Sequence, residues 1–222
     1  TDAITNYFFT TSEVANQNLK ENGVKNDQIF FVGNTMIDTL LKQRPRFQKP
    51  AIWNELGLKE RNYIVMTLHR PANVDEESKL KELLDEIINN THDLPLVFPV
   101  HPRTAKMLQN LGISHPRLHF SEPMSYLEFN YLVERAKAVV TDSGGITEET
   151  TVMGVPCMTL RDNTERPETV TIGTNELIGT NPKAIAPAMK ALFEGKWKKG
   201  KIPALWDGNT AERIVELLVS YL

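Results

Sequence analysis

The sequence predicts an α/β protein built on a Rossmann-like, doubly wound parallel sheet. Short apolar segments alternate with amphipathic helical segments along most of the chain, as in βαβ units whose sheet is covered on both faces. Polar and ionisable residues follow four successive apolar segments, at the edge where the ligand of such a sheet binds. No internal repeat or low-complexity tract interrupts the alternation.

The composition is that of a globular protein, and it narrows the function classes. The 222 residues are 41% hydrophobic and 24% charged, and a net charge of −3 lacks the basic excess of nucleic-acid binders. Cys157 is the only cysteine, which excludes an intrachain disulfide and a cysteine-rich metal site. No apolar run approaches the ~20 residues that span a bilayer. Without a signal peptide, we expect a cytoplasmic protein with no membrane contact. The chain opens at Thr1 without Met, which indicates part of a longer chain.

The first 50 residues predict two short strands and two helices. Asn6–Thr10 is an aromatic-rich strand, and Ser12 is a candidate N-cap of the helix that follows it. Gln28–Val32 is a second strand, and it precedes a helix through Met36–Leu41. Two prolines and several basic residues in 42–50 break the pattern and predict a loop or hinge.

The doubly wound domain is predicted between Asn62 and Gly195. Residues 62–68 form a near-continuous apolar run, as expected of a strand buried on both faces. Residues 76–90 repeat Leu and Ile with helical spacing. The same two patterns predict strands at 96–100, 117–120, 138–141 and 156–160, a stub at 177–178, and helices at 104–111, 125–135, 146–153, 182–193 and 210–222.

Polar segments follow four of the predicted strands at one edge of the sheet. They are His69–Asn73, His101–Arg103, Asp142–Glu149 and Arg161–Glu168. Residues that serve only as turns would usually be Gly, Asn, Asp or Ser. The histidines and arginines at this edge therefore indicate a binding site.

Ser143-Gly144-Gly145 connects a predicted strand to a predicted helix and suits an anion. The N–H groups at a helix start, together with the serine hydroxyl, favour a phosphate or diphosphate. Glu149 lies about one turn into the helix, where its carboxylate can accept from two ribose hydroxyls. The alternative is a tight turn whose acidic residues only complement the helix dipole. The spacing gives the two interpretations equal weight.

A single histidine after a buried strand is more often a hydrogen-bonded edge residue with no further role, but two such histidines, each accompanied by Arg, favour a phosphate site. The arginines also allow two interpretations. Arg70, Arg103 and Arg166 can neutralise phosphate charge, and Arg suits this through its forked guanidinium. Each can instead form a surface ion pair with Asp142, Glu165 or Glu168, which stabilises little. Cys157 begins an apolar strand after a proline, so it is expected to be a small buried residue rather than a nucleophile.

Taken together, these motifs resemble the non-hydrolysing UDP-N-acetylglucosamine (UDP-GlcNAc) 2-epimerases. The markers fall in the family's order over nearly the whole chain. They are Gly33-Asn34-Thr35 with Ile37-Asp38, Thr67–Arg70 with Asn73, His101-Pro102, Asp142–Gly145 with Glu148-Glu149, Gly154–Pro156, Arg161-Asp162 and Thr164–Glu168. Ala72 stands where many members carry Glu, and Met124 where some carry Gln.

The resemblance implies the C-terminal half of a two-domain GT-B fold with its active site between the domains. Residues 1–45 would then be the last strand of a missing N-terminal domain with connecting helices. Residues 46–205 would be the UDP-binding Rossmann-like domain, and residues 206–222 a crossover helix. The full-length protein is expected to be a homodimer.

The resemblance also implies roles for individual residues. Ser143, Gly144 and Gly145 would hold the diphosphate, Glu149 the ribose, Met124 and Phe129 the uracil, and Arg166 the nucleotide sugar. His69 would be the catalytic histidine near the diphosphate. Arg70 and His101 would line a second, regulatory nucleotide-sugar site. No cofactor and no metal are implied.

The implied reaction interconverts UDP-GlcNAc and UDP-N-acetylmannosamine (UDP-ManNAc) by elimination and re-addition of UDP. It would serve cell-wall or surface polysaccharide biosynthesis. The acid and base at C2 would belong to the missing domain, and Glu148 is expected to face away from the sugar. A GT-B glycosyltransferase and a nucleotide-binding module without turnover remain as alternatives, and the chain alone is predicted to be inactive.

Overall fold

The computed structural model describes residues 4–100 and 102–221. The chain forms two compact units, which are described separately. One unit comprises Thr1–Pro45 with Ile202–Leu222, and the other comprises Arg46–Lys201. Among the described residues, no helix combines the length and the apolar character that crossing a bilayer requires.

The smaller unit is built on two short parallel strands, β1 and β2. The strands are β1 (Phe8–Thr10) and β2 (Ile29–Phe31), and the helical elements are α1 (Glu13–Glu21), the 3-10 turn η2 (Asn26–Gln28), α2 (Thr35–Gln43) and α11 (Thr210–Tyr221). The predicted N-cap is confirmed, because the Ser12 side chain accepts from the Ala15 N–H. Asp38 on α2 accepts from the N–H groups of Thr210 and Ala211 and so ties α11 to α2.

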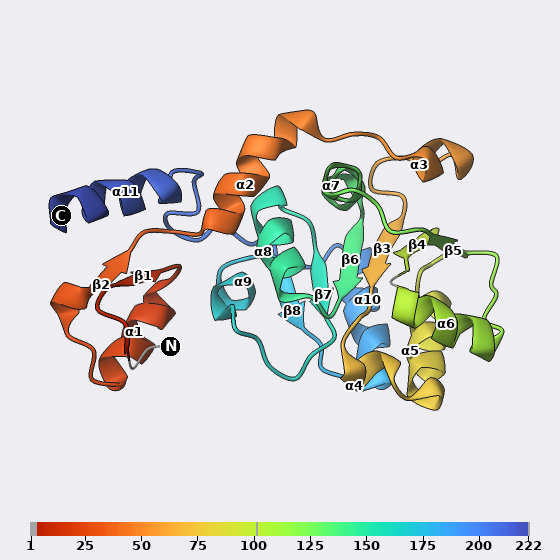
Figure 1. Cartoon of the computed structure of the whole chain (residues 1–222). Coiled ribbons are helices and arrows are strands. Elements are labelled where there is room, and N and C mark those ends of the chain that lie inside the picture. The colour runs from red at the N-terminus through yellow and green to blue at the C-terminus, as the bar shows by residue number, and fades with distance from the viewer. Residues whose placement is uncertain (1–3, 101, 222) are drawn as a thin grey trace. The chain divides into compact units, whose positions relative to one another are not determined.

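The larger unit contains a six-stranded, wholly parallel sheet. Its strand order is β5-β4-β3-β6-β7-β8. Figure 1 shows β3, β6 and β7 side by side in its middle. The strands are β3 (Ile64–Thr67), β4 (Leu96–Pro99), β5 (Leu118–Ser121), β6 (Ala138–Thr141), β7 (Cys157–Thr159) and β8 (Asn175–Leu177). The first strand lies in the middle and the order reverses beside it, which is the Rossmann arrangement. The predicted fold class is confirmed.

Helices connect the strands of this sheet. They are α3 (Ala51–Glu55), α4 (Pro71–Val74), α5 (Glu77–Asn89), α6 (Pro102–Leu111), α7 (Tyr126–Arg135), α8 (Gly144–Met153), α9 (Pro167–Thr171), η4 (Pro182–Ala184) and α10 (Ile185–Phe193). The sequence did not predict α3, α4 and α9, because four or five residues are too few to show helical periodicity.

The loop predicted at 42–50 is wrong at its start. Helix α2 continues to Gln43 and passes directly into the 3-10 turn η3 (Arg44–Arg46). Lys42 and Gln43 are good helix formers. The α-helix therefore ends at Gln43, with Arg44 as its C-cap just before Pro45.

The two faces of the sheet bury different residues. Ile64, Met66 and Val140 belong to a core cluster that also contains apolar residues of α5 and α10. Alternate residues such as Val65 and Val139 are also fully buried, and they point to the opposite face. Helix α8 contacts β6, β7 and β8, and it packs beside α7 and α9. Burial on both faces explains why the strands are continuously apolar.

Replacing Gly33 by Ala is expected to lower the free energy of unfolding of the smaller unit by about 3 kcal/mol. Gly33 has φ +106°, and a Cβ there would lie 2.2 Å from the carbonyl oxygen of Leu205. Urea unfolding followed by Trp fluorescence would measure the loss. Gly23 is the matched control, because it has φ +84° but a Cβ would meet nothing within 4 Å. Gly23→Ala should cost about 1 kcal/mol, and equal losses would contradict the role of the close approach.

Candidate functional site

The candidate site lies at the carboxyl ends of β3 and β6, where the strand order changes direction. β3 pairs with β4 on one side and β6 on the other, so the loops after β3 and β6 leave the sheet next to each other. Thr67 and Thr141 are paired at the ends of these strands, and their hydroxyl oxygens are 2.7 Å apart. Ligands of open α/β sheets bind at such a switch point.

Asp142 is a fully buried carboxylate that holds the two loops together. Its Oδ2 accepts from the backbone N–H groups of His69 at 3.1 Å and Arg70 at 2.9 Å, and from Asn73 Nδ2 at 3.0 Å. Asn73 Nδ2 also donates to the carbonyl oxygen of Leu160, just after β7. Burial raises the pKa of Asp142, but hydrogen bonds from His69, Asn73 and Arg70 outweigh burial and hold that pKa below its ordinary value.

His69 joins this carboxylate through its ring. Nδ1 of His69 lies 2.7 Å from Oδ1 of Asp142, and 49% of the His69 side chain is exposed. The hydrogen bond to Asp142 raises the pKa of His69 above its ordinary value, although partial burial and the nearby Arg70 and Arg161 oppose the shift. His69 can therefore present a proton or a positive charge at the rim.

Helix α8 begins at this rim with the predicted Ser-Gly-Gly turn. Ser143 is its N-cap, and Gly144 and Gly145 are its first residues, so their N–H groups have no acceptor within the helix. The Ser143 N–H instead donates to Thr141 Oγ1 at 3.0 Å. The backbone donors that remain for an anion are those of the glycines, with the Ser143 hydroxyl beside them.

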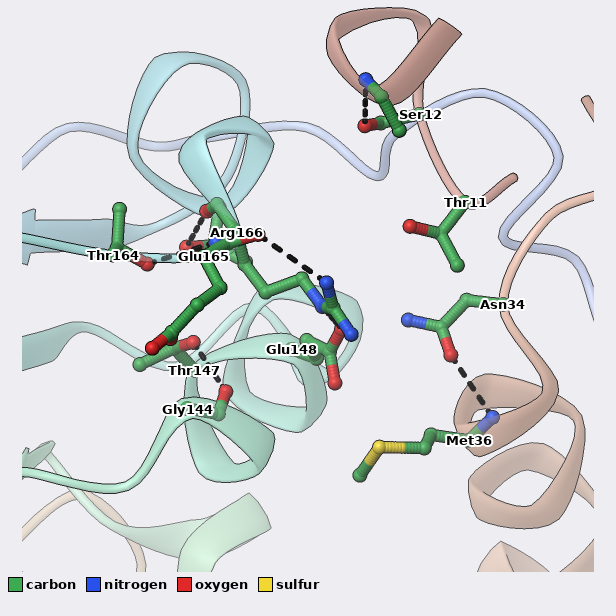
Figure 2. A network of polar contacts seen from close by, with 12 residues as sticks. Thr11, Ser12, Asn34, Met36, Gly144, Thr147, Glu148, Thr164, Glu165 and Arg166 are labelled. Carbon is green, nitrogen blue, oxygen red and sulfur yellow. Dashed lines mark hydrogen bonds and ion pairs between the residues drawn. The ribbon is translucent and has the colours of Figure 1, made fainter. Parts of the chain in front are cut away.

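An internal ion pair lies in front of this helix start. Arg161 is 6% exposed, and its Nη1 and Nη2 donate to Oε2 and Oε1 of Glu165 at 2.8 and 2.7 Å. A Cβ on Gly144 would lie 3.8 Å from both Arg161 Nη1 and Glu165 Oε2. Figure 2 shows the Glu165 side chain directed from its loop towards the first turn of α8. The Arg161 guanidinium lowers the pKa of Glu165 to about 2, so Glu165 is charged.

Arg166, predicted to contact the nucleotide sugar, lies on Glu148. Nε of Arg166 forms an ion pair with Oε1 of Glu148, which is buried in α8 (Figure 2). The Arg166 N–H donates to Thr164 Oγ1 at 3.0 Å, and Nη1 donates to the carbonyl oxygen of Glu165. The Arg166 side chain is 38% exposed, so part of it is open to solvent.

Glu149, the candidate ribose ligand, is also held by a neighbouring helix. The hydroxyl of Tyr126 on α7 donates to Glu149 Oε1 at 2.8 Å. Burial raises the pKa of Glu149 above its ordinary value, and hydrogen bonds from Tyr126 and Asn130 oppose the rise. Tyr126 is 41% exposed, so the pair lies at the edge of the site. No motif in the sequence pointed to Tyr126.

Of the other predicted ligand residues, Arg70 contacts this centre. Phe129 is half-buried on α7, and Met124 is half-buried in the loop before α7. Nε of Arg70 donates to the backbone carbonyl of Asp142 at 3.0 Å. His101, its predicted partner in a regulatory site, lies outside the described residues. Cys157 is fully buried, as predicted, and burial raises the pKa of its thiol to about 12.

Three residue groups that are far apart in sequence are thus brought to one edge of the sheet. They are His69 with Asp142 and Asn73, Gly144 with Arg161 and Glu165, and Glu149 with Tyr126. Asn73 and Arg161 stood within recognised motifs without an assigned role, and Glu165 was considered only as an ion-pair partner of Arg70, Arg103 or Arg166. The Arg161–Glu165 pair lies in a loop rather than on a helix, so no helical spacing signalled it.

Comparison with known proteins identifies relatives over almost the whole chain. The sequence profile of a family described as UDP-N-acetylglucosamine 2-epimerase matches residues 1–219. A protein of Methanocaldococcus jannaschii named UDP-N-acetylglucosamine 2-epimerase is 38% identical over 231 residues, covering 98% of this chain and 62% of that protein. A protein of Pseudomonas aeruginosa named UDP-2,3-diacetamido-2,3-dideoxy-D-glucuronate 2-epimerase is 35% identical, covering 98% of this chain and 61% of that protein.

A solved structure has the same fold. The crystal structure of Methanocaldococcus jannaschii UDP-GlcNAc 2-epimerase in complex with UDP-GlcNAc and UDP superposes with a TM-score of 0.85 at 36% identity. The match covers 99% of this chain and 62% of that one. The chain therefore spans a little over three fifths of the length of the relatives that it matches.

Proposed function

Because the chain belongs to the UDP-N-acetylglucosamine 2-epimerase family, we propose that it is the UDP-binding part of an enzyme that interconverts UDP-GlcNAc and UDP-ManNAc. The observation that carries this proposal is the meeting of the His69–Asp142 pair with the glycine start of α8 at the switch point of the sheet. A relative of the same fold was crystallised with UDP-GlcNAc and UDP, which supports a nucleotide sugar as the ligand.

The proposed binding mode follows the donors and acceptors at this edge. The diphosphate lies at the start of α8, on the N–H groups of Gly144 and Gly145 and on the Ser143 hydroxyl. The Glu149 carboxylate, whose Oε1 accepts from Tyr126, also accepts from the ribose. Phe129 and Met124 face the uracil, and the exposed part of Arg166 faces the nucleotide sugar.

The proposed chemistry needs this site mainly to stabilise a leaving anion. Loss of the C2 proton and breaking of the C1–O bond give the 2-acetamidoglucal and UDP. Protonation of C2 from the other face and re-addition of UDP at C1 then give the epimer. The start of α8, Arg166 and His69 stabilise the charge that develops on UDP. The acid and base at C2 are proposed to lie in the part of the relatives that this chain does not span.

A second candidate substrate comes from the Pseudomonas aeruginosa relative. The name of that relative gives UDP-2,3-diacetamido-2,3-dideoxy-D-glucuronate as the substrate of a 2-epimerase. Both candidates share the nucleotide, which is the part that the proposed mode binds. A glycosyltransferase or a binding module without turnover also shares it, and assays for UDP-ManNAc formation separate these from an epimerase.

The Glu149→Gln variant tests the proposed binding mode. The amide keeps the size of the side chain but loses the charged acceptor, so UDP and UMP should both bind about tenfold more weakly. Inorganic pyrophosphate has no ribose and should bind the variant as it binds the wild type. Isothermal calorimetry on the 222-residue chain measures all three ligands.

Two further outcomes decide between the interpretations. If pyrophosphate binding falls with UDP binding, Glu149 shapes the helix start rather than holding the ribose. If wild-type chain binds neither UDP nor UDP-GlcNAc, the proposed function is wrong. Tyr126→Phe serves as the matched control, because it removes the hydrogen bond to Glu149 and leaves the carboxylate in place. A smaller loss of UDP affinity is expected from it.

A further inference from the structure

Asp142 has a place in the site that the proposed binding mode does not use. It immediately precedes Ser143 and Gly144 in the chain, and its carboxylate faces away from them, into the loop after β3. A buried carboxylate is stable only when donors surround it. Three segments provide this setting. Asp142 follows β6 directly, the loop after β3 donates through His69 and Arg70, and α4 donates through Asn73.

Asn73 locks the orientation of this carboxylate. It is 1% exposed, and its Nδ2 divides its two hydrogens between Asp142 Oδ2 at 3.0 Å and the Leu160 carbonyl at 3.1 Å. Oδ2 therefore receives the donors of α4 and of the loop after β3. Oδ1 faces the ring of His69 at 2.7 Å and shares the His69 backbone N–H at 3.2 Å. An ionised carboxylate has about four lone-pair sites, which is enough to accept all of these hydrogen bonds.

This arrangement fixes the direction of the His69 ring. An ionised carboxylate only accepts hydrogen bonds, so Nδ1 of His69 must carry its proton towards Asp142. Nε2 is then the end of the ring that solvent or a ligand can reach. The charged groups that act on the ring are Asp142, which favours the imidazolium, and Arg70 and Arg161, which oppose it.

We propose that Asp142 is a positioning residue that holds His69 as an imidazolium and points its Nε2–H at the diphosphate of the bound nucleotide sugar. The inference rests on the proposed function, because it takes the ligand from there. An imidazolium has no lone pair with which to remove the C2 proton. His69 therefore donates to the departing UDP, and Asp142 keeps the buried negative charge that makes this donation possible.

If His69 donates as an imidazolium, the affinity for UDP-GlcNAc should decrease with increasing pH. The cationic donor is present below the raised pKa of His69 and is lost as the pH increases through it. UDP-GlcNAc is the suitable probe, because its diphosphate has no terminal phosphate whose second ionisation near pH ~6 would add its own dependence. The affinity of the wild-type chain for UDP-GlcNAc should fall as the pH increases through the pKa of His69. The affinity of the His69→Gln variant should not change with pH in the same range.

The first measurement needs no change at Asp142. NMR titration of the histidine rings, with the His69 signal assigned by its loss in His69→Gln, gives the pKa of His69 directly. The expected value lies above 6.5, the ordinary value, with Nδ1 protonated in both charge states. A value at or below 6.5 overturns the proposal.

Asp142→Asn then separates positioning from a structural role. Its affinity for UDP-GlcNAc at pH 7 should fall about tenfold, as expected for a lost charged hydrogen bond, and its pH dependence should vanish. The Asp142→Asn, His69→Gln double variant should bind no more weakly than the single variants. Asp85→Asn is the charge-matched control, because Asp85 pairs only with the exposed Lys81 on α5 among the described contacts.

The outcomes distinguish this proposal from the proposed function. Additive losses in the double variant would show that Asp142 acts other than through His69, and they would overturn the proposal. A wild-type chain with a raised His69 pKa but no binding of UDP-GlcNAc would contradict the proposed function instead. If Asp142→Asn does not fold, the wild-type titration and the flat profile of His69→Gln still decide the question.

Discussion

Replacing Gly144 by Val is expected to weaken UDP binding more than a hundredfold while the chain stays folded. A Cβ at this position would lie 3.8 Å from Arg161 Nη1 and from Glu165 Oε2, which is ordinary contact distance. The fold can therefore accept the new side chain. The Val methyl groups, however, fill the space through which a phosphate reaches the glycine N–H groups. Losing two charged hydrogen bonds, each about 1.5–3 kcal/mol, accounts for the expected factor.

Calorimetric titration with UDP and with pyrophosphate measures this effect. The affinities for UDP and for pyrophosphate should both fall, since both ligands approach the helix start through their phosphates. Gly144→Ala is the graded control and should lose less affinity, because it adds one methyl group and no branch. Circular dichroism and thermal unfolding establish that both variants are folded. If Gly144→Val bound UDP as tightly as the wild type does, the diphosphate would not bind at this turn.

The second prediction concerns catalysis by the 222-residue chain alone. We expect the 222-residue chain to bind UDP but to convert no detectable UDP-GlcNAc into UDP-ManNAc. General acid–base catalysis contributes about 10²–10⁴-fold for each group, and the proposal places both groups outside this chain. An open site also loses the exclusion of water that a covering domain provides. NMR detection of UDP-ManNAc in the reaction mixture is a direct assay.

Robust conversion by this chain would contradict that expectation and would locate the acid and base within it. Glu148 would then be the first residue to test, because it follows the Ser-Gly-Gly turn on α8. The structure opposes such a role, since the Glu148 carboxylate is buried and forms an ion pair with Arg166. Glu148→Gln would therefore change any background rate only through Arg166, whose ion-pair partner it removes.

Much of the fold followed from local patterns in the sequence. The buried parallel strands are short apolar runs, and helices such as α5 and α7 span enough turns to show their periodicity. The predicted ends are mostly within two residues of the observed ones. Helices α3, α4 and α9 escaped because they are single turns, and packing rather than periodicity determines where such turns form.

The site was predictable as a set of loops but not as a set of contacts. Residues after buried parallel strands must gather at one edge, which placed His69, Asp142 and Arg161 near each other. The hydrogen bond between His69 and Asp142 joins residues 73 positions apart, and its donors and acceptors depend on strand register. The bond from Tyr126 to Glu149 depends on how α7 packs beside α8. Neither of these two hydrogen bonds produces a periodic pattern in the sequence.

The carboxylate of Glu165 acts as a built-in counterion beside the start of α8. It already pairs with the Arg161 guanidinium next to Gly144. A diphosphate bound there as proposed would compete with this carboxylate, so its affinity should reflect the difference between two anions. A monovalent anion such as chloride is then expected to gain little over the resident carboxylate. A diphosphate has more charge and more oxygen atoms, so we expect discrimination by anion charge before any discrimination by sugar or base.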